Sequence, residues 1–231
     1  MPMNSRPNFI HKILRGDNNY PERLNDLYDP PACLYINGDI TLLKEPMVAI
    51  VGSRKSSAQG LAHSHYFAQS LSKAGTTVIS GLAKGIDGAA HRASLGIGSK
   101  TLAVCGTGLD ITYPKEHLAL AHAISNHGLL VSEFAPGTGP KAFHFPRRNR
   151  LIAALALGVL VIEAAEKSGS LITARLAAEL GREVFALPGP INDPLFTGCN
   201  ELIQQGAKLT RSPKDVLEEL TFHQKHHLNW F

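Results

Sequence analysis

A short apolar run that ends at a glycine constrains this chain more than any other feature. Residues 47–51 read Met-Val-Ala-Ile-Val and are followed directly by Gly52, Ser53 and Arg54. A continuous apolar run bounded by a turn residue is typical of a strand buried on both faces of a parallel sheet. Ligands of such sheets bind beyond the carboxyl ends of the strands, and the amino end of the next helix favours anions. The run therefore predicts a phosphate-facing site that contains Arg54. The alternative is a plain tight turn with solvated charges.

The same pattern of a short apolar run, a turn and an amphipathic stretch recurs along the chain. The expected strands after the first are 77–80, 101–104, 129–132, 158–162 and 182–186. The expected helices are 58–73, 88–95, 115–125, 148–157, 170–180 and 213–220. Residues 34–36, which precede an Asn-Gly turn dipeptide, predict one more strand that extends the sheet. Strands that alternate with helices predict a doubly wound α/β fold, with a mainly parallel sheet and helices on both faces.

The boundaries of the domain follow from where this alternation starts and stops. We expect one domain over residues 20–220, because the chain shows no internal repeat and no low-complexity linker. Residues 1–19 are expected to be flexible apart from an apolar patch at residues 9–14. Residues 221–231 form a tail without periodicity, which we expect either to be disordered or to pack back through Trp230.

Composition narrows the classes of partner and the compartment. The formal charge of +4 and the pI of about 9.0 mildly favour an anionic partner. Three scattered cysteines show neither a disulfide framework nor metal-ligand spacing, which predicts a reducing, cytoplasmic location. The amino terminus lacks the apolar core of a signal peptide, and the most apolar segment, 151–162, is too short to span a bilayer. We therefore expect no membrane association. We expect no metal either, because His63 and His65 would lie on different faces of a helix.

Motifs of the common α/β enzymes are absent. The first turn has one glycine where dinucleotide binding needs G-x-G-x-x-G, and no P-loop motif follows it. No serine lies in a G-x-S-x-G elbow. Asp87, Asp110, Glu133 and Glu163 lie near strand ends and could serve acid–base chemistry. Helix capping is the favoured role for Asp87. We predict no cofactor and no enzymatic activity.

The loop at residues 143–150 combines the residue types that bind bases and phosphates. Aromatic residues alternate there with arginines and an asparagine, in the series Phe143, Phe145, Arg147, Arg148, Asn149 and Arg150. Bases stack on aromatic and guanidinium planes, and arginines hold phosphates. Arginines at the start of a helix oppose its dipole at about 0.3–1 kcal/mol each, a cost that an anionic ligand would offset. With Arg54, Lys55 and Lys84, this loop predicts a basic rim at one edge of the sheet. The alternative is a solvated helix start with one buried phenylalanine.

Taken together and in order, these turns resemble the DNA-processing protein A (DprA/Smf) family over roughly residues 20–217. The matching strings are Val-Gly-Ser-Arg at 51–54, Ser-Gly-Leu-Ala-Lys-Gly-Ile-Asp at 80–87, Gly-Thr-Gly-Leu-Asp at 106–110, Tyr-Pro at 113–114, Ser-Glu at 132–133, Phe-Pro-Arg-Arg-Asn-Arg-Leu-Ile at 145–152, Gly-Ser-Leu-Ile-Thr-Ala at 169–174, Pro-Gly at 188–189, Gly-Cys-Asn-Glu-Leu-Ile at 198–203 and Gly-Ala at 206–207. Each string alone is modest, and the ordered set is highly specific.

The resemblance implies an extended Rossmann-like fold that binds single-stranded DNA and delivers it to the RecA recombinase during natural transformation and homologous recombination. It also implies a homodimer. The full set of DNA-contacting residues that we expect is Gly52, Ser53, Arg54, Lys55, Lys84, Gly106, Gly108, Lys115, Lys141, Phe143, Phe145, Arg147, Arg148, Asn149, Arg150, Gly169, Ser170 and Thr173. The apolar faces of residues 172–180 and 202–209 are candidates for self-association.

This sequence departs from the longer members of the family. Many members carry a helical domain before the Rossmann part, and some carry a winged-helix domain after it; we expect neither in this sequence.

A second class of protein, the lysine-decarboxylase-like nucleotide phosphoribohydrolases, binds nucleoside monophosphates at the same sheet edge. Its Pro-Gly-Gly-x-Gly-Thr-x-x-Glu motif is absent, and the nearest stretch, 167–173, lacks the double glycine. A scaffold without any ligand is the third possibility.

Overall fold

The structure is a computed structural model that describes residues 9–227, with side chains described for residues 9–220. The expectation that Trp230 packs back onto the domain concerns a residue outside this range. Within the described range, no helix combines the length and the apolar character needed to cross a membrane.

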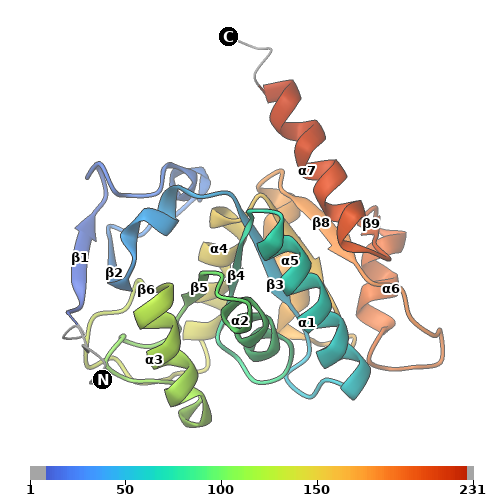
Figure 1. Cartoon of the computed structure of the whole chain (residues 1–231), viewed down its shortest axis with the longest axis horizontal. Helices are drawn as coiled ribbons and strands as arrows, with labels where there is room; N and C mark the ends of the chain where they lie inside the picture. Colours follow the sequence, from blue (N-terminus) through green and yellow to red (C-terminus); the bar gives the residue numbers. More distant parts are fainter. Residues whose placement is uncertain (1–8, 228–231) are drawn as a thin grey trace.

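One nine-stranded sheet forms the centre of the molecule (Figure 1). Its strands are β1 His11–Leu14, β2 Cys33–Gly38, β3 Met47–Val51, β4 Thr77–Ser80, β5 Thr101–Val104, β6 Leu129–Ser132, β7 Gly158–Val161, β8 Glu183–Ala186 and β9 Lys208–Leu209. They are arranged in the order β1-β2-β6-β5-β4-β3-β7-β8-β9. Along the part of this order that runs β6-β5-β4-β3-β7-β8-β9, each strand is parallel to its neighbours. Strand β2 pairs antiparallel with β6, and β1 pairs antiparallel with β2. This confirms the mainly parallel, doubly wound sheet, and the predicted strand at residues 34–36 extends it.

Helices cover both faces of the sheet. They are α1 Ala58–Lys73, α2 Ile86–Gly96, α3 Leu118–His127, α4 His144–Leu155, α5 Gly169–Glu179, α6 Thr197–Gln204 and α7 Pro213–His227, with short 3-10 turns η1 Glu22–Asp26, η2 Ile40–Lys44 and η3 Lys115–His117. The helices α1, α2 and α7 pack on one face, and α4, α5 and α6 share the core of the other. In Figure 1, α7 extends away from the body of the domain.

Strand β3 shows why the opening run has no polar residue. Val48 and Ile50 contribute to the core beneath α1 and α2. Met47, Ala49 and Val51 contribute to the opposite core beneath α4 and α5. Because successive side chains point to opposite faces, a strand covered on both sides must be apolar at every position.

The predicted elements are present, and most differences lie at their ends. The helix predicted at 148–157 begins at His144, because a proline such as Pro146 is tolerated in the first turn, where its missing N–H would have no partner. The helix predicted at 115–125 is split into η3 and α3. Helix α7 continues to His227, so the expected tail begins as helical backbone. The apolar patch at residues 9–14 contributes β1.

The carboxyl end of α4 is held by arginines from two distant segments. Arg23 donates to the Leu155 carbonyl at 3.4 Å, and Arg182 donates to the Ala154 carbonyl at 3.3 Å. Cations at a helix carboxyl end are favoured by the helix dipole and satisfy carbonyls that lack an intrahelical partner. These contacts fix the helix that carries several of the predicted site residues.

His91 is a fully buried histidine in α2 that packs under the sheet. The Thr101 hydroxyl donates to the Val78 carbonyl at 2.7 Å, so the 2.8 Å contact between Thr101 and His91 Nδ1 requires the ring nitrogen to donate. The other ring nitrogen is buried and has no partner among the described residues. Burial, with a smaller contribution from His117, lowers the pKa of His91 to about 3.

This environment predicts an acid-sensitive fold. An unfolded histidine titrates near pH 6.5, so between pH 6.5 and about 3 the unfolded chain binds a proton that folded His91 does not. Stability should therefore fall as the pH drops through this window, by up to about 1.4 kcal/mol per pH unit from this group. Melting temperatures between pH 7.5 and 4.5 should decline less steeply for His91→Gln than for the parent. Parallel declines would contradict this assignment.

Candidate functional site

The loop after β3 is held by close backbone packing. The Ser53 amide donates to the Glu163 carbonyl at 2.7 Å, and the Lys55 amide donates to the Ser53 hydroxyl at 3.1 Å. A Cβ atom at Gly52 would lie 2.7 Å from the Ile86 side chain, so only glycine fits there. Arg54 and Lys55 are left exposed at the end of this turn.

The amino end of α1 is already occupied by a carboxylate of the chain itself. Glu163, which follows β7 and is fully buried, accepts a hydrogen bond from the Ser57 amide at 2.9 Å and another from the Ser57 hydroxyl. The same hydroxyl accepts from the Gly60 amide at 2.9 Å and caps the helix. The prediction that this helix end receives an external anion is therefore corrected, because an internal one fills the position.

Arg148 lies beneath the carboxyl ends of the strands rather than in solvent. It is 4% exposed, and its guanidinium donates to the Gly81 carbonyl and, at 2.7 Å, to the Val104 carbonyl. Its Nε donates to the Asn149 side chain at 3.1 Å. Arg148 thus ties together the ends of β4 and β5 and orients its neighbour Asn149.

Asp87 faces the same buried region and does not cap a helix in the expected way. Helix α2 is preceded by Gly85, and the Asp87 carboxylate accepts from the Gly81 amide at 3.1 Å and from the Ala83 amide at 3.3 Å. Burial raises the pKa of Asp87, and the positive charge of Arg148 opposes this shift. Asp87 therefore orders the loop after β4.

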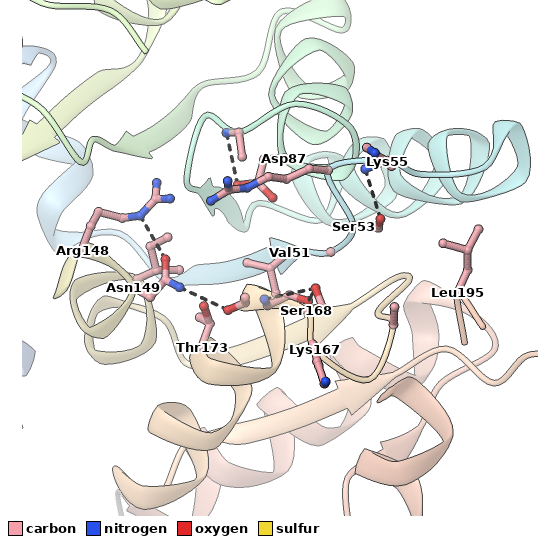
Figure 2. A pocket seen from close by; sticks show the side chains of 17 residues that line it. Val51, Ser53, Lys55, Asp87, Arg148, Asn149, Lys167, Ser168, Thr173 and Leu195 are labelled. Carbon is pink, nitrogen blue, oxygen red and sulfur yellow. Dashed lines mark hydrogen bonds between the residues drawn. The ribbon is translucent and has the colours of Figure 1, made fainter. Parts of the chain in front are cut away.

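The amino end of α5 forms the opposite wall. Ser168 caps this helix through a long 3.4 Å bond from the Ser170 amide, and the Asn149 side chain donates to the Gly169 carbonyl at 3.2 Å. Thr173 is 1% exposed, and its hydroxyl has no hydrogen-bond partner among the described residues. Figure 2 shows Arg148, Asn149 and Thr173 grouped on one side of the pocket, with Asp87 across from them.

An aromatic face lies beside this wall. The rings of Tyr113 and Phe145 are tilted against each other with centroids 5.2 Å apart, and the Arg54 guanidinium lies 5.5 Å from the Phe145 ring centroid. A Cβ atom at Gly106 would lie 2.9 Å from the Phe145 ring, which explains the glycine there. The arrangement presents an aromatic plane next to an exposed cation.

These walls enclose two adjoining cavities. The larger, which we call the switch-point cavity, has a volume of about 630 Å³ and lies where the connections from β3 and β7 diverge, the position at which doubly wound sheets bind ligands. Its lining residues are Val51, Gly52, Ser53, Arg54, Lys55, Ala83, Asp87, Arg148, Asn149, Ile152, Ala165, Lys167, Ser168, Gly169, Ser170, Thr173 and Leu195.

The smaller, which we call the aromatic cavity, has a volume of about 440 Å³. Its lining residues are Arg54, Tyr113, Pro140, Lys141, Ala142, Phe145, Pro146, Asn149, Gly169 and Ile172. Arg54, Asn149 and Gly169 line both cavities. The two cavities therefore share one wall.

Most of the residues predicted from the sequence meet at these cavities. Those that line at least one of them are Gly52, Ser53, Arg54, Lys55, Lys141, Phe145, Arg148, Asn149, Gly169, Ser170 and Thr173. Within the described part of the chain, Arg54, Lys55, Lys141 and Lys167 have no acidic group within 4 Å. Their positive charge is thus available to a ligand.

Arg147 and Arg150 lie elsewhere. Both pair with the Glu133 carboxylate, and the Arg147 Nε donates to it at 3.0 Å. Arg150 also donates to the Asp29 carbonyl at 2.6 Å. Since α4 begins at His144, these arginines fall beyond its first turn. The expectation that they need an external anion to offset the helix dipole is therefore wrong, because Glu133 supplies the negative charge.

The other predicted residues lie around the cavities without lining them. Lys84 pairs with Glu116 at 2.5 Å. Gly108 packs against the loop at residues 135–138, with its amide donating to the Thr138 carbonyl at 2.9 Å. Phe143 is 66% exposed, with Lys141 at 5.9 Å from its ring centroid, and Lys115 is exposed at the start of η3. Their predicted DNA contacts stay predictions.

Several lining residues were not among the predicted set. Tyr113 stood next to a matching Tyr-Pro string, but only the structure shows it packed on Phe145. Lys167 lies in the turn that follows β7 and lines the switch-point cavity. Its position after a parallel strand at the switch point of the sheet is the sequence feature that could have identified it as a site residue. Leu195 comes from the loop between β8 and α6, and nothing in its local sequence points to the site.

Known proteins are similar to this chain in sequence and in fold. The family model described as DNA recombination-mediator protein A matches residues 11–221. The DNA processing protein DprA of Streptococcus pneumoniae is 52% identical over 206 residues, which cover 89% of this chain and 73% of that protein. Protein Smf of Escherichia coli is 46% identical over 214 residues, which cover 92% of this chain and 57% of that protein.

Two solved structures extend the similarity to three dimensions. The X-ray structure of DNA processing protein A from Streptococcus pneumoniae superposes with a TM-score of 0.88 at 50% identity, covering 91% of this chain and 74% of that one. DNA processing protein A from Helicobacter pylori, described for its single-stranded DNA binding mode, superposes with a TM-score of 0.84 at 32% identity, covering 93% and 96%. With a family model that spans residues 11–221, this chain belongs to the DNA recombination-mediator protein A family.

Proposed function

We propose that this protein binds single-stranded DNA along the two joined cavities. The observation that carries the proposal is the convergence of Arg54, Lys55, Lys141 and Lys167, each without an acidic partner in the described chain, around the aromatic face of Phe145. Cations track the phosphates of a single strand while aromatic rings accept its bases. The structural relative from Helicobacter pylori, described for its single-stranded DNA binding mode, supports this assignment.

The finer role follows from the family. The protein would shield incoming DNA and load RecA recombinase during natural transformation and homologous recombination, in the cytoplasm and without enzymatic activity. The four carboxylates near strand ends support a non-enzymatic role, because each is engaged in structure. Asp87 and Glu163 hold backbone amides, Asp110 accepts from the Gly137 amide at 2.8 Å, and Glu133 holds two arginines. RecA filament growth on strands coated with single-strand-binding protein should start faster when the protein is added.

Self-association belongs to the same proposal. Ile172 on α5 is 39% exposed, and Leu209 on the edge strand β9 is 46% exposed. These residues lie on the two apolar faces expected to pair in a homodimer. Two sites aligned on one strand would gain affinity from their effective concentration. Sedimentation of the protein across a concentration series should give a dimer mass.

Phe145→Ala tests whether the aromatic cavity accepts a base. If Phe145 stacks a base, the substitution should weaken single-strand binding by about 1–3 kcal/mol. Fluorescence anisotropy with a labelled oligothymidylate measures this loss, and the melting temperature of the variant checks its fold. If Phe145 only packs the domain, the melting temperature will fall while the folded fraction binds normally.

The phosphoribohydrolase alternative has a direct test. Purified protein incubated with nucleoside monophosphates should release no free base. Release of base would replace the DNA-binding proposal with an enzymatic one.

A further inference from the structure

The two cavities differ in chemistry although they share a wall. Tyr113 and Phe145 line the aromatic cavity, whereas none of the described residues that line the switch-point cavity is aromatic. The switch-point cavity therefore offers no ring on which a base could stack. Its volume of about 630 Å³ lies in the range of small-molecule sites.

The switch-point cavity is instead rich in positive charge. Arg54, Lys55 and Lys167 lie on its lining, with the buried Arg148 behind them, and the carboxyl group of Asp87 is the acidic group among the described lining residues. Lys55 and Lys167 have no acidic partner within 4 Å in the described chain. Three cations, Arg54, Lys55 and Lys167, that have no acidic partner in the described chain suit a ligand with more than one negative charge.

Polar groups converge on one side of this cavity. The amino end of α5 lines it at Gly169 and Ser170, where the capping Ser168 hydroxyl makes only a long 3.4 Å contact with the Ser170 amide, while Glu163 occupies the amino end of α1. The Thr173 hydroxyl lines the cavity on a residue that is 1% exposed, and it has no partner among the described residues. A phosphate here would accept from the Gly169 amide, from this hydroxyl and from Lys167.

We propose that the switch-point cavity binds a terminal phosphate monoester of a DNA strand, an inference that rests on the proposed single-strand binding. An internal phosphate diester carries one negative charge, whereas a terminal monoester carries about 1.5–2 at neutral pH. The shared wall at Arg54 and Asn149 lets a nucleotide place its phosphate in this cavity and its base against Phe145. The site would then hold a strand end in preference to an internal segment.

The test compares three oligothymidylates of equal length, one with a 5′-phosphate, one with a 3′-phosphate and one with hydroxyl groups at both ends. Competition against a labelled strand, followed by anisotropy with the full chain, gives the three affinities. One phosphorylated end should bind about tenfold tighter than the hydroxyl-ended strand, because charge-assisted hydrogen bonds to phosphate are strong. Three affinities within twofold of each other would overturn the proposal.

Variants locate the contact. Lys167→Ala and Thr173→Val, the latter nearly isosteric, should each bring the ratio of phosphorylated to hydroxyl-ended affinity toward one. Lys73→Ala removes an exposed lysine at the far end of α1 and should keep the full ratio. If both cavity variants retain the parent ratio, the phosphate binds elsewhere and the proposal fails.

Failure of this inference can be told from failure of the proposed function. Binding of the hydroxyl-ended strand tests the function, and the ratio between strands tests the inference. If no strand binds, the melting temperature with thymidine 5′- or 3′-monophosphate is compared with that in thymidine alone. A rise with either monophosphate supports the cavity as a phosphate monoester site without DNA binding, and no rise overturns it.

Discussion

Arg54→Ala should weaken single-stranded DNA binding about 10- to 100-fold at low salt, because Arg54 lines both cavities and no acidic group in the described chain competes for its guanidinium. The loss includes a phosphate contact and the guanidinium plane that lies over Phe145. The slope of log affinity against log salt should fall by about one phosphate contact. Anisotropy across a salt series measures both quantities.

Lys84→Ala is the matched control for this prediction. Lys84 is an exposed cation on the loop after β4, but its ammonium group pairs with Glu116. Removing a cation that is already paired should lower the affinity less than about threefold. Equal losses for Arg54→Ala and Lys84→Ala would show that general surface charge, and not the joined cavities, holds the strand.

Arg148→Ala should destabilise the fold by about 3–5 kcal/mol, although Arg148 was predicted to hold phosphates. Its removal leaves the Gly81 and Val104 carbonyls without their donor and leaves the buried Asp87 carboxyl without the facing positive charge. For a chain of this size the melting temperature should fall by roughly 6–20 °C. Thermal unfolding followed by circular dichroism measures the shift.

The neighbouring Arg147→Ala provides the comparison. Arg147 is half-exposed, and its partner Glu133 keeps Arg150 when Arg147 is removed. Its loss should cost less than about 1 kcal/mol, as is usual for exposed ion pairs. If Arg148→Ala melts like the parent but loses DNA binding, then Arg148 contacts DNA directly and its structural role is overturned.

Local sequence patterns determine where the strands of this chain lie, whereas its charge pairs depend on tertiary packing. The strands are set by local patterns, so β3, β4, β5 and β6 begin and end at the predicted residues. The edge at which the site lies follows from the parallel topology alone, because every turn that follows a parallel strand meets there. This explains why 11 of the predicted residues line the two cavities.

The pairing of charges could not be predicted in the same way. Five arginines and lysines near residue 150 and residue 54 look equivalent in the sequence, but Glu133 pairs with Arg147 and Arg150, and backbone carbonyls accept from Arg148. Likewise, Glu163 fills the helix end that follows residue 57 from more than a hundred positions away. Such contacts depend on long-range packing, which hydrophobic periodicity does not encode.

Binding of one labelled oligonucleotide, single-stranded and as a duplex, across a salt series tests the central claim most directly. The joined cavities predict tight single-strand binding with a steep salt slope and much weaker duplex binding, because a paired base cannot stack on Phe145. Equal affinity for both forms, or no single-strand binding by folded protein at low salt, would contradict the assignment of these cavities to single-stranded DNA.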